Sequence, residues 1–191
     1  MSPRRGYWNQ RSKHPMALSA AALLTRLQAF DGRAVSILGE IEAEYRGEAE
    51  YLDALIALAA HDQAAVSSGA TWLIKAALER GEALSLTESE ALWDEIPAIR
   101  HWQAQLHVCQ SAAYLTFSAD GAATMARWLA PLLDHDRPFL RAWSVDALCR
   151  VAAQHREYCH AARDAARAAA KDSAASVRAR VRQLGDLLAD L

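Results

Sequence analysis

Four segments of the chain open in the same way, about 37 residues apart on average. Each has an aspartate followed four or five positions later by a branched apolar residue, and in three of the four an arginine comes next. The apolar positions are separated by 33, 41 and 37 residues and are Val66, Ile99, Leu140 and Val177. A period of this length indicates a repeat protein, in which each unit buries its apolar face only against its neighbours.

The residues between these openings favour helix. Ala, Leu, Arg and Glu dominate, the alternation typical of strands is missing, and the Gly- or Asp-containing breaks are short. In the segment SLTESEAL, Thr87 and Glu90 have the spacing of a capping box, which predicts a helix start. We therefore expect an all-α chain, an α-solenoid of ten helices in five antiparallel pairs, with helices over 17–30, 32–46, 48–60, 62–80, 88–96, 98–116, 119–134, 137–155, 156–170 and 173–190.

With Asp172, Val177 and Arg178, the last segment resembles the opening of the second helix of a HEAT repeat. The resemblance covers about residues 48–190, while the pair at 17–46 matches less closely and is interpreted as a cap. It implies a HEAT-like α-solenoid over residues 17–191. Residues 1–16 are basic and are interpreted from their composition as a flexible arm. In such a fold the second helices line a concave surface.

The segment Asp134-His135-Asp136-Arg137 has two interpretations, a metal or acid–base site and a corner between helices. Asp136 stands in the same place as Asp62, Asp94 and Asp172, just before an expected helix, where an aspartate can accept bonds from free backbone N–H groups. The corner interpretation is therefore preferred. His61 is the counterpart of His135.

Composition narrows the classes of partner. The chain has 52% hydrophobic and 23% charged residues and a formal net charge of −2, so no strong overall field draws it to nucleic acid or membrane. Residues 1–96 have 9 Lys and Arg against 14 Asp and Glu, whereas residues 97–191 have 12 against 9. Six acidic residues between Glu40 and Asp53 form either a solvated helix face or a partner-binding patch.

No signal peptide, membrane span or metal motif is expected. No apolar run approaches the roughly 18 residues that a membrane helix needs. Cys109, Cys149 and Cys159 have no CxxC spacing and are interpreted as buried reduced thiols, which favours a cytoplasmic protein. His155 and Cys159 are four residues apart, but a corner is expected between them, so no metal or other cofactor is predicted.

The repeat register also suggests a binding surface. Counted from the apolar positions, a stripe of aromatic, polar and charged side chains falls on the exposed border of the second helices, either as a partner site or as packing between repeats. It comprises Trp72, Trp102, Gln105, Trp143, Asp146, Arg150, Arg180 and Gln183. The arginines after the apolar positions are expected to bridge to the aspartate of their own or the next repeat; they are Arg100, Arg141 and Arg178.

Two functions follow from these features. Because no GxGxxG, P-loop, GxSxG or HExxH motif is present, the first is a non-enzymatic scaffold that binds a protein or peptide on its concave face, with unknown oligomeric state. The alternative is a nucleic-acid-binding protein. Trp143 and Asp146 resemble the aromatic and catalytic acid residues of HEAT-like alkylpurine DNA glycosylases, which implies that Asp146 stabilises a cationic sugar. The repeat alone is also compatible with the HEAT-like bilin lyases.

Overall fold

The computed structural model describes residues 20–191, which fold as helices joined by short connections and contain no strand. The all-α prediction is confirmed for this range. The expected arm at 1–16 and the first three residues of the helix expected at 17–30 lie outside the described residues. The α-helices are α1 (Ala20–Gln28), α2 (Val35–Tyr45), α3 (Tyr51–Ala57), α4 (Ala64–Glu79), α5 (Leu86–Glu95), α6 (Trp102–Ser111), α7 (Ala119–Leu129), α8 (Pro138–Gln154), α9 (Cys159–Ala169), α10 (Ala175–Gln183) and α11 (Gly185–Asp190).

Short 3₁₀ turns extend several of these helices. Turns η1 (Ile96–Ala98), η2 (Ala112–Tyr114) and η3 (Ala130–Leu132) follow α5, α6 and α7, and η4 (Arg156–Tyr158) precedes α9. The helix expected at 173–190 is two helices, because the chain bends at Leu184 between α10 and α11. None of the helices described in residues 20–191 is long and apolar enough to cross a membrane.

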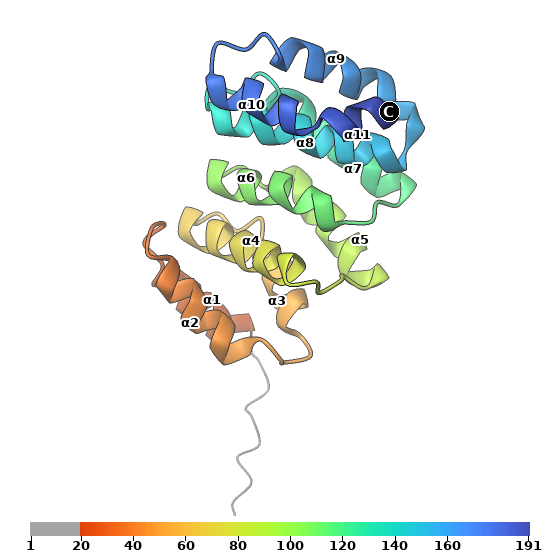
Figure 1. Ribbon diagram of the computed structural model, residues 1–191. Coiled ribbons are helices and arrows are strands. Elements are labelled where there is room, and N and C mark those ends of the chain that lie inside the picture. Colours follow the sequence, from red (N-terminus) through yellow and green to blue (C-terminus); the bar gives the residue numbers. More distant parts are fainter. Residues whose placement is uncertain (1–19) are drawn as a thin grey trace, which may run out of the picture.

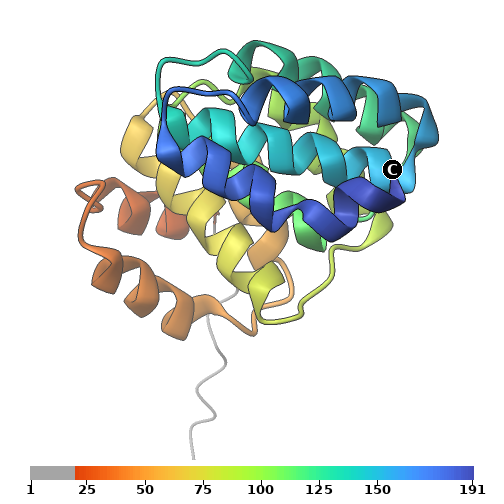
Figure 2. The same cartoon turned by 45° about the horizontal axis from the view of Figure 1, so that its top comes forward.

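Helices α4, α6, α8 and α10 lie side by side in sequence order and form what we call the front layer (Figures 1 and 2). Helices α3, α5 and α7 lie behind it, each in contact with the next (Figure 1). Helices α1 and α2 pack on α4 at one end of the molecule, and α9 packs on α8 near the other. The two layers are joined by contacts between consecutive helices, α3 with α4 and α7 with α8.

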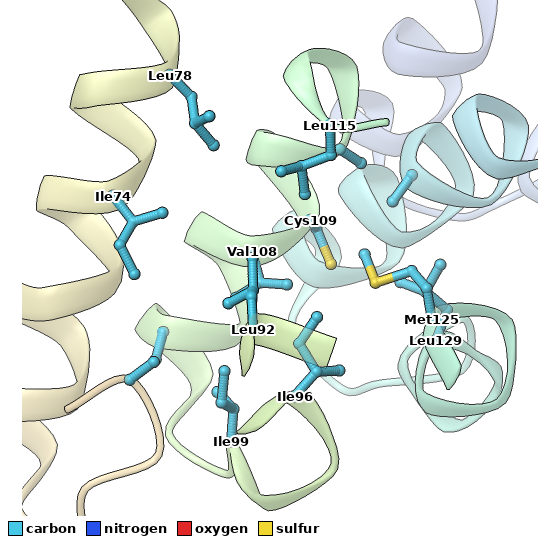
Figure 3. Packing of buried hydrophobic residues seen from close by; sticks show 14 of the residues in the cluster. Ile74, Leu78, Leu92, Ile96, Ile99, Val108, Cys109, Leu115, Met125 and Leu129 are labelled. Carbon is cyan, nitrogen blue, oxygen red and sulfur yellow. The ribbon is translucent and has the colours of Figure 1, made fainter. Parts of the chain in front are cut away.

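The two layers share one hydrophobic core (Figure 3). Most of its labelled members come from α4, α5, η1, α6 and α7 and include Ile74, Leu78, Leu92, Ile96, Val108, Met125 and Leu129. Burying one side chain of this size stabilises the fold by about 1.5–3 kcal/mol. The predicted burial of Cys109, Cys149 and Cys159 is confirmed, and none of the three forms a disulfide.

The front helices start at nearly constant intervals, which corrects the register read from the sequence. They begin at Ala64, Trp102, Pro138 and Ala175, so the intervals are 38, 36 and 37 residues. The third residue of each helix is fully buried and the set is Val66, Ala104, Leu140 and Val177. The prediction of Ile99 as the second member of this set is therefore wrong.

Ile99 lies before α6 because the preceding helix ends late. The η1 turn, with Pro97 in its first turn, continues α5 as far as Ala98. Asp94 therefore lies inside α5 and is not equivalent to the aspartates before the other front helices. Arg100, which is predicted to bridge to an aspartate like Arg141 and Arg178, is exposed in the connection.

The expected helix caps also differ from those observed. At α5 the capping box is formed by Ser85 and Glu88, two residues before the expected pair of Thr87 and Glu90. The helices after Asp62 and Asp136 have no side-chain cap bond, since their N-cap residues are Gln63 and Arg137.

The side chain two positions before the N-cap makes the bond that was expected of these aspartates. His61 Nδ1 accepts from the backbone N–H of Gln63 at 3.0 Å, and His135 Nδ1 accepts from Arg137 at 3.0 Å. Asp172 Oδ1 accepts from Ala174 in the same way at 2.7 Å. A local bond of this kind fixes a turn before a helix. His135 and its neighbours therefore form a corner.

The fourth residue of each front helix donates a side-chain hydrogen bond back to the chain before that helix. Gln105 Nε2 bonds the carbonyl of Ile99 at 3.3 Å, Arg141 Nη1 that of His135 at 2.7 Å, and Arg178 Nη1 that of Asp172 at 2.6 Å. Ser67 Oγ bonds the carbonyl of Ala59 at 2.6 Å. We call these four bonds the corner braces. Three of them reach a carbonyl six residues earlier, whereas Ser67 reaches eight residues back, and each supplies a donor to a backbone carbonyl before the helix.

Two glycines allow helices to approach closely. A Cβ atom at Gly69 of α4 would lie 2.7 Å from Cδ2 of Leu27 and 3.2 Å from Cδ2 of Leu38, so α1 and α2 pack directly against this helix. A Cβ atom at Gly121 of α7 would lie 2.6 Å from Nε1 of Trp93. The absence of a side chain at these positions sets the distance between the helices.

Candidate functional site

Four of the eight predicted site residues meet in one pocket in the front layer. The pocket, which we call the Asp146 pocket, has a volume of about 310 Å³ and is open to solvent. It lies where α4, α6 with η2, α8 and α10 come together. Its lining residues are Lys75, Glu79, Gln110, Ala113, Tyr114, Trp143, Asp146, Arg150 and Arg180.

Asp146 is the buried charge of this pocket, with 2% of its surface exposed. Its Oδ1 accepts a hydrogen bond from Arg150 Nε on the same helix at 3.2 Å. Its Oδ2 lies 3.6 Å from Arg180 Nη1 on the neighbouring α10. A buried carboxylate requires such partners, because an isolated ion is strongly disfavoured away from water. The Asp146 carboxylate thus holds two guanidinium groups from different helices.

Trp143 supports the second of these guanidinium groups. The Arg180 carbon Cζ lies 3.6 Å from the centre of the Trp143 ring, a close cation–π contact. Trp143 is half-buried on α8, one turn before Asp146. Ring and carboxylate together hold Arg180 in one orientation, and both come from the same helix.

The other two charged residues that line the pocket come from α4. Lys75 Nζ lies 2.7 Å from Glu79 Oε1, four residues along the same helix. The lining therefore has three cationic side chains against two carboxylates. Since Lys75 and Glu79 neutralise each other, the excess positive charge lies with Arg150 and Arg180 around Asp146.

The other four predicted residues lie outside the Asp146 pocket. Trp72 is half-buried and packs against the core, and Gln183 is exposed at the end of α10. Trp102 is 37% exposed at the start of α6, with Arg137 stacked 4.2 Å above its ring. Gln105 forms the corner brace of α6. Their role in binding stays a prediction.

The corrected register identifies what the sequence interpretation missed. Counting from Ala104, His107 is the counterpart of Trp143, and Gln110 is the counterpart of Asp146. Gln110 and Tyr114 line the pocket. The signal that would have found them is Pro97, which favours the end of one helix and a later start of the next.

His107 lies beside the pocket but does not act as a charged group. Its Nδ1 is 3.2 Å from Thr71 Oγ1. Burial, together with the positive charge of Lys75, lowers the pKa of His107 to about 4. The imidazole is therefore neutral at physiological pH and links α6 to α4 by a polar contact.

The thiols near Asp146 are unreactive. Burial, and then the negative charge of Asp146, raises the pKa of Cys149 to about 12. The same two causes raise the pKa of Cys109. Both thiols stay protonated at neutral pH, so neither is a nucleophile. No group of His, Cys, Asp and Glu within residues 20–191 is arranged to hold a metal ion.

A larger hollow of about 860 Å³ lies between α9 and the corners that precede α8 and α10. Its main charged groups already satisfy one another. Arg141 donates to both carboxylate oxygens of Asp172, at 2.7 and 2.9 Å, and its Nη1 also bonds the carbonyls of His135 and Asp136. Of the three arginines expected to bridge to an aspartate, Arg141 does so, whereas Arg178 bonds backbone carbonyls. Because four of the five N–H groups of Arg141 already have partners, the Asp146 pocket is the better candidate.

The acidic segment between Glu40 and Asp53 is partly neutralised within the protein. Arg26 of α1 lies 3.3 Å from Glu44 and 4.0 Å from Glu40, and Arg80 forms an ion pair with Glu42. These contacts favour the interpretation as a helix face over that of an unpaired acidic patch.

Comparison of the chain with protein-family models, with curated proteins and with solved structures finds no match. The assignment of a function therefore depends on the geometry of the site.

Proposed function

We propose that this chain is a HEAT-like α-solenoid that acts as a non-enzymatic interaction protein and binds a macromolecular partner on its front layer. The regular starts of the front helices and the repeated corner braces support the solenoid. A stack of this kind presents one continuous helical surface, which suits a protein or peptide partner.

The observation that carries the proposal is the assembly of Trp143, Asp146, Arg150 and Arg180 in one pocket on that layer. Trp and Arg side chains are the residue types that contribute most at protein interfaces. Here they are held in place before any partner arrives, so little side-chain entropy is lost on binding.

The test is affinity capture from a lysate of the source organism, with and without nuclease, using wild type and a Trp143→Ala/Arg150→Ala double variant. We expect a protein partner that survives nuclease with wild type and is lost with the double variant, while circular dichroism shows unchanged helix content. Retention of the partner by the folded double variant would remove this proposal.

A second candidate is an alkylpurine DNA glycosylase-like activity with Asp146 and Trp143 at its centre. It is favoured by the presence of both residues in one pocket, with a cationic side chain beside them. Against it, Asp146 is buried and faces two guanidinium groups, which leaves little room for contact with a sugar. Release of alkylated base by wild type, and its loss in Asp146→Asn, would establish this activity.

A further inference from the structure

We propose that the Asp146 pocket binds a carboxylate group of an acidic peptide segment, and that Arg150 and Arg180 are the residues that hold it. This inference depends on the proposed interaction function and specifies the chemistry of the partner.

The charge of the pocket supports an anionic ligand. Two guanidinium groups flank the single buried carboxylate of Asp146, so the group of three has a net positive charge. The other ion pair of the lining, Lys75 with Glu79, is neutral. In a partly buried pocket this excess charge is poorly screened, and one further carboxylate would balance it.

Donor groups remain available for that carboxylate. Within residues 20–191, the only hydrogen bond of the Arg150 side chain is the one from Nε to Asp146, and Arg180 forms its ion pair and ring contact without a hydrogen bond. Each guanidinium has five N–H donors in a planar fork that fits a carboxylate. Both forks are exposed in part, with 37% of the Arg150 side chain and 26% of the Arg180 side chain accessible.

The structure also explains why these donors are ready to bind. Arg180 is stacked on Trp143, which covers one face of the guanidinium and leaves its edge for hydrogen bonds. Asp146 holds both arginines in place from beneath. A flexible arginine would lose rotamer freedom on binding, and this loss is avoided here.

Size and charge favour an acidic peptide over nucleic acid. A pocket of about 310 Å³ is at the small end of the range for ligand sites and suits one or two side chains. A nucleic acid strand requires a cation for each phosphate along its path, whereas here two carboxylates interrupt the cations. The site therefore has the features of a single anchor for one carboxylate.

The experiment measures fluorescence anisotropy of fluorescein-labelled acetyl-hexaglutamate on addition of the full chain, with acetyl-hexaglutamine and a single-stranded oligodeoxynucleotide as comparison probes. We expect hexaglutamate to bind and hexaglutamine not to bind. Arg180→Gln should weaken hexaglutamate binding by at least about tenfold, since a hydrogen bond to a charged group is lost. The matched control is Arg182→Gln, an exposed arginine of the same helix outside the pocket.

A second variant distinguishes weaker binding from unfolding of the protein. Arg180→Lys keeps a cation beside Asp146 but removes the planar fork, so we expect a folded protein with weakened hexaglutamate binding. Equal loss in Arg180→Gln and Arg182→Gln, or no binding by wild type, would overturn the carboxylate assignment. Tighter binding of the oligonucleotide that is lost in Arg180→Gln would overturn it in favour of nucleic acid.

These outcomes are separate from failure of the proposed function. One outcome is that the double variant Trp143→Ala/Arg150→Ala loses the captured partner while wild type does not bind hexaglutamate. In that case the proposed interaction function is supported and the carboxylate assignment is wrong. If the folded double variant keeps its partner, the interaction function itself is wrong.

Discussion

The two ends of the front layer are joined to their neighbours by different kinds of contact. At the first end, Gly69 of α4 lets Leu27 and Leu38 pack closely against the helix backbone, and both leucines are fully buried. At the other end, two ion pairs join α8 to α10 and the corner before it: Arg141 pairs with Asp172 of that corner, and Asp146 pairs with Arg180 of α10. We call these the apolar junction and the charged junction.

The difference between the two junctions shows that one kind of contact mainly stabilises the fold and the other presents groups that can bind a ligand. Close apolar packing stabilises without leaving any group for a ligand. A partly buried ion pair adds less net stability, because desolvation offsets its attraction, but it fixes the register of two helices and presents charged groups at the surface. The candidate site lies at the charged junction for this reason.

The largest expected effect is at the apolar junction. Leu27→Ala should lower the free energy of unfolding by about 3 kcal/mol, because it removes buried methyl groups and leaves a cavity. Urea denaturation measures this change. The matched control is Leu86→Ala, since Leu86 is 72% exposed and its removal should change stability by less than about 0.5 kcal/mol. A small loss at Leu27 would mean that α1 does not support α4.

A second effect is expected at the charged junction. Arg141→Gln should lower the free energy of unfolding by about 1–2 kcal/mol, since it removes the paired bonds to Asp172 and a corner brace. Arg100→Gln is the control. The sequence predicts that Arg100 and Arg141 are equivalent, but Arg100 is exposed in a connection. Equal losses in the two variants would contradict the corrected register.

The contribution of the charged junction to the free energy of unfolding should also depend on pH. The Arg141 guanidinium, followed by the backbone N–H of Ala174, lowers the pKa of Asp172 from 3.8 to about 2. Because the folded value is the lower one, Asp172 stabilises the fold above about pH 4, and this contribution is lost as the pH falls towards 2.

The measurement is the difference in unfolding free energy between wild type and Asp172→Asn as the pH is lowered through that range. We expect the advantage of wild type to shrink. The effect of Leu27→Ala should stay constant over the same range, because no titrating group is involved. A constant advantage over Asp172→Asn would show that the ion pair is not the cause.

The smallest effect on stability is expected from Trp143. Trp143→Leu removes the ring beneath Arg180 but keeps an apolar side chain, so the loss from the cation–π contact should be about 0.5–1 kcal/mol. Thermal unfolding monitored by circular dichroism measures it. The same variant should weaken hexaglutamate binding, because Arg180 loses its fixed orientation. Normal binding with reduced stability would assign Trp143 to packing alone.

Much of the fold could be predicted from the sequence, and the reason is periodicity. Helical residues dominate, and Val66, Leu140 and Val177 mark the same place in three units. The start of α6 is predicted wrongly because Ile99 and Arg100 match the pattern of an apolar residue followed by arginine. The third residue of α6, Ala104, is small and gives no comparable signal. Contacts between side chains on different helices could not be predicted from the sequence, since the pair of Arg180 and Asp146 depends on how α8 and α10 pack.

The burial of Asp146 has a consequence for the order in which the newly made chain can assemble during synthesis. Its first partner, Arg150, is four residues away and is present as soon as α8 forms. Its second, Arg180, belongs to α10, which is made later. Until α10 docks, Asp146 has Arg150 as a partner but lacks Arg180, and α10 supplies the second guanidinium group. A nascent or truncated chain that ends before Arg180 therefore lacks both this ion pair with Asp146 and the cation–π contact with Trp143.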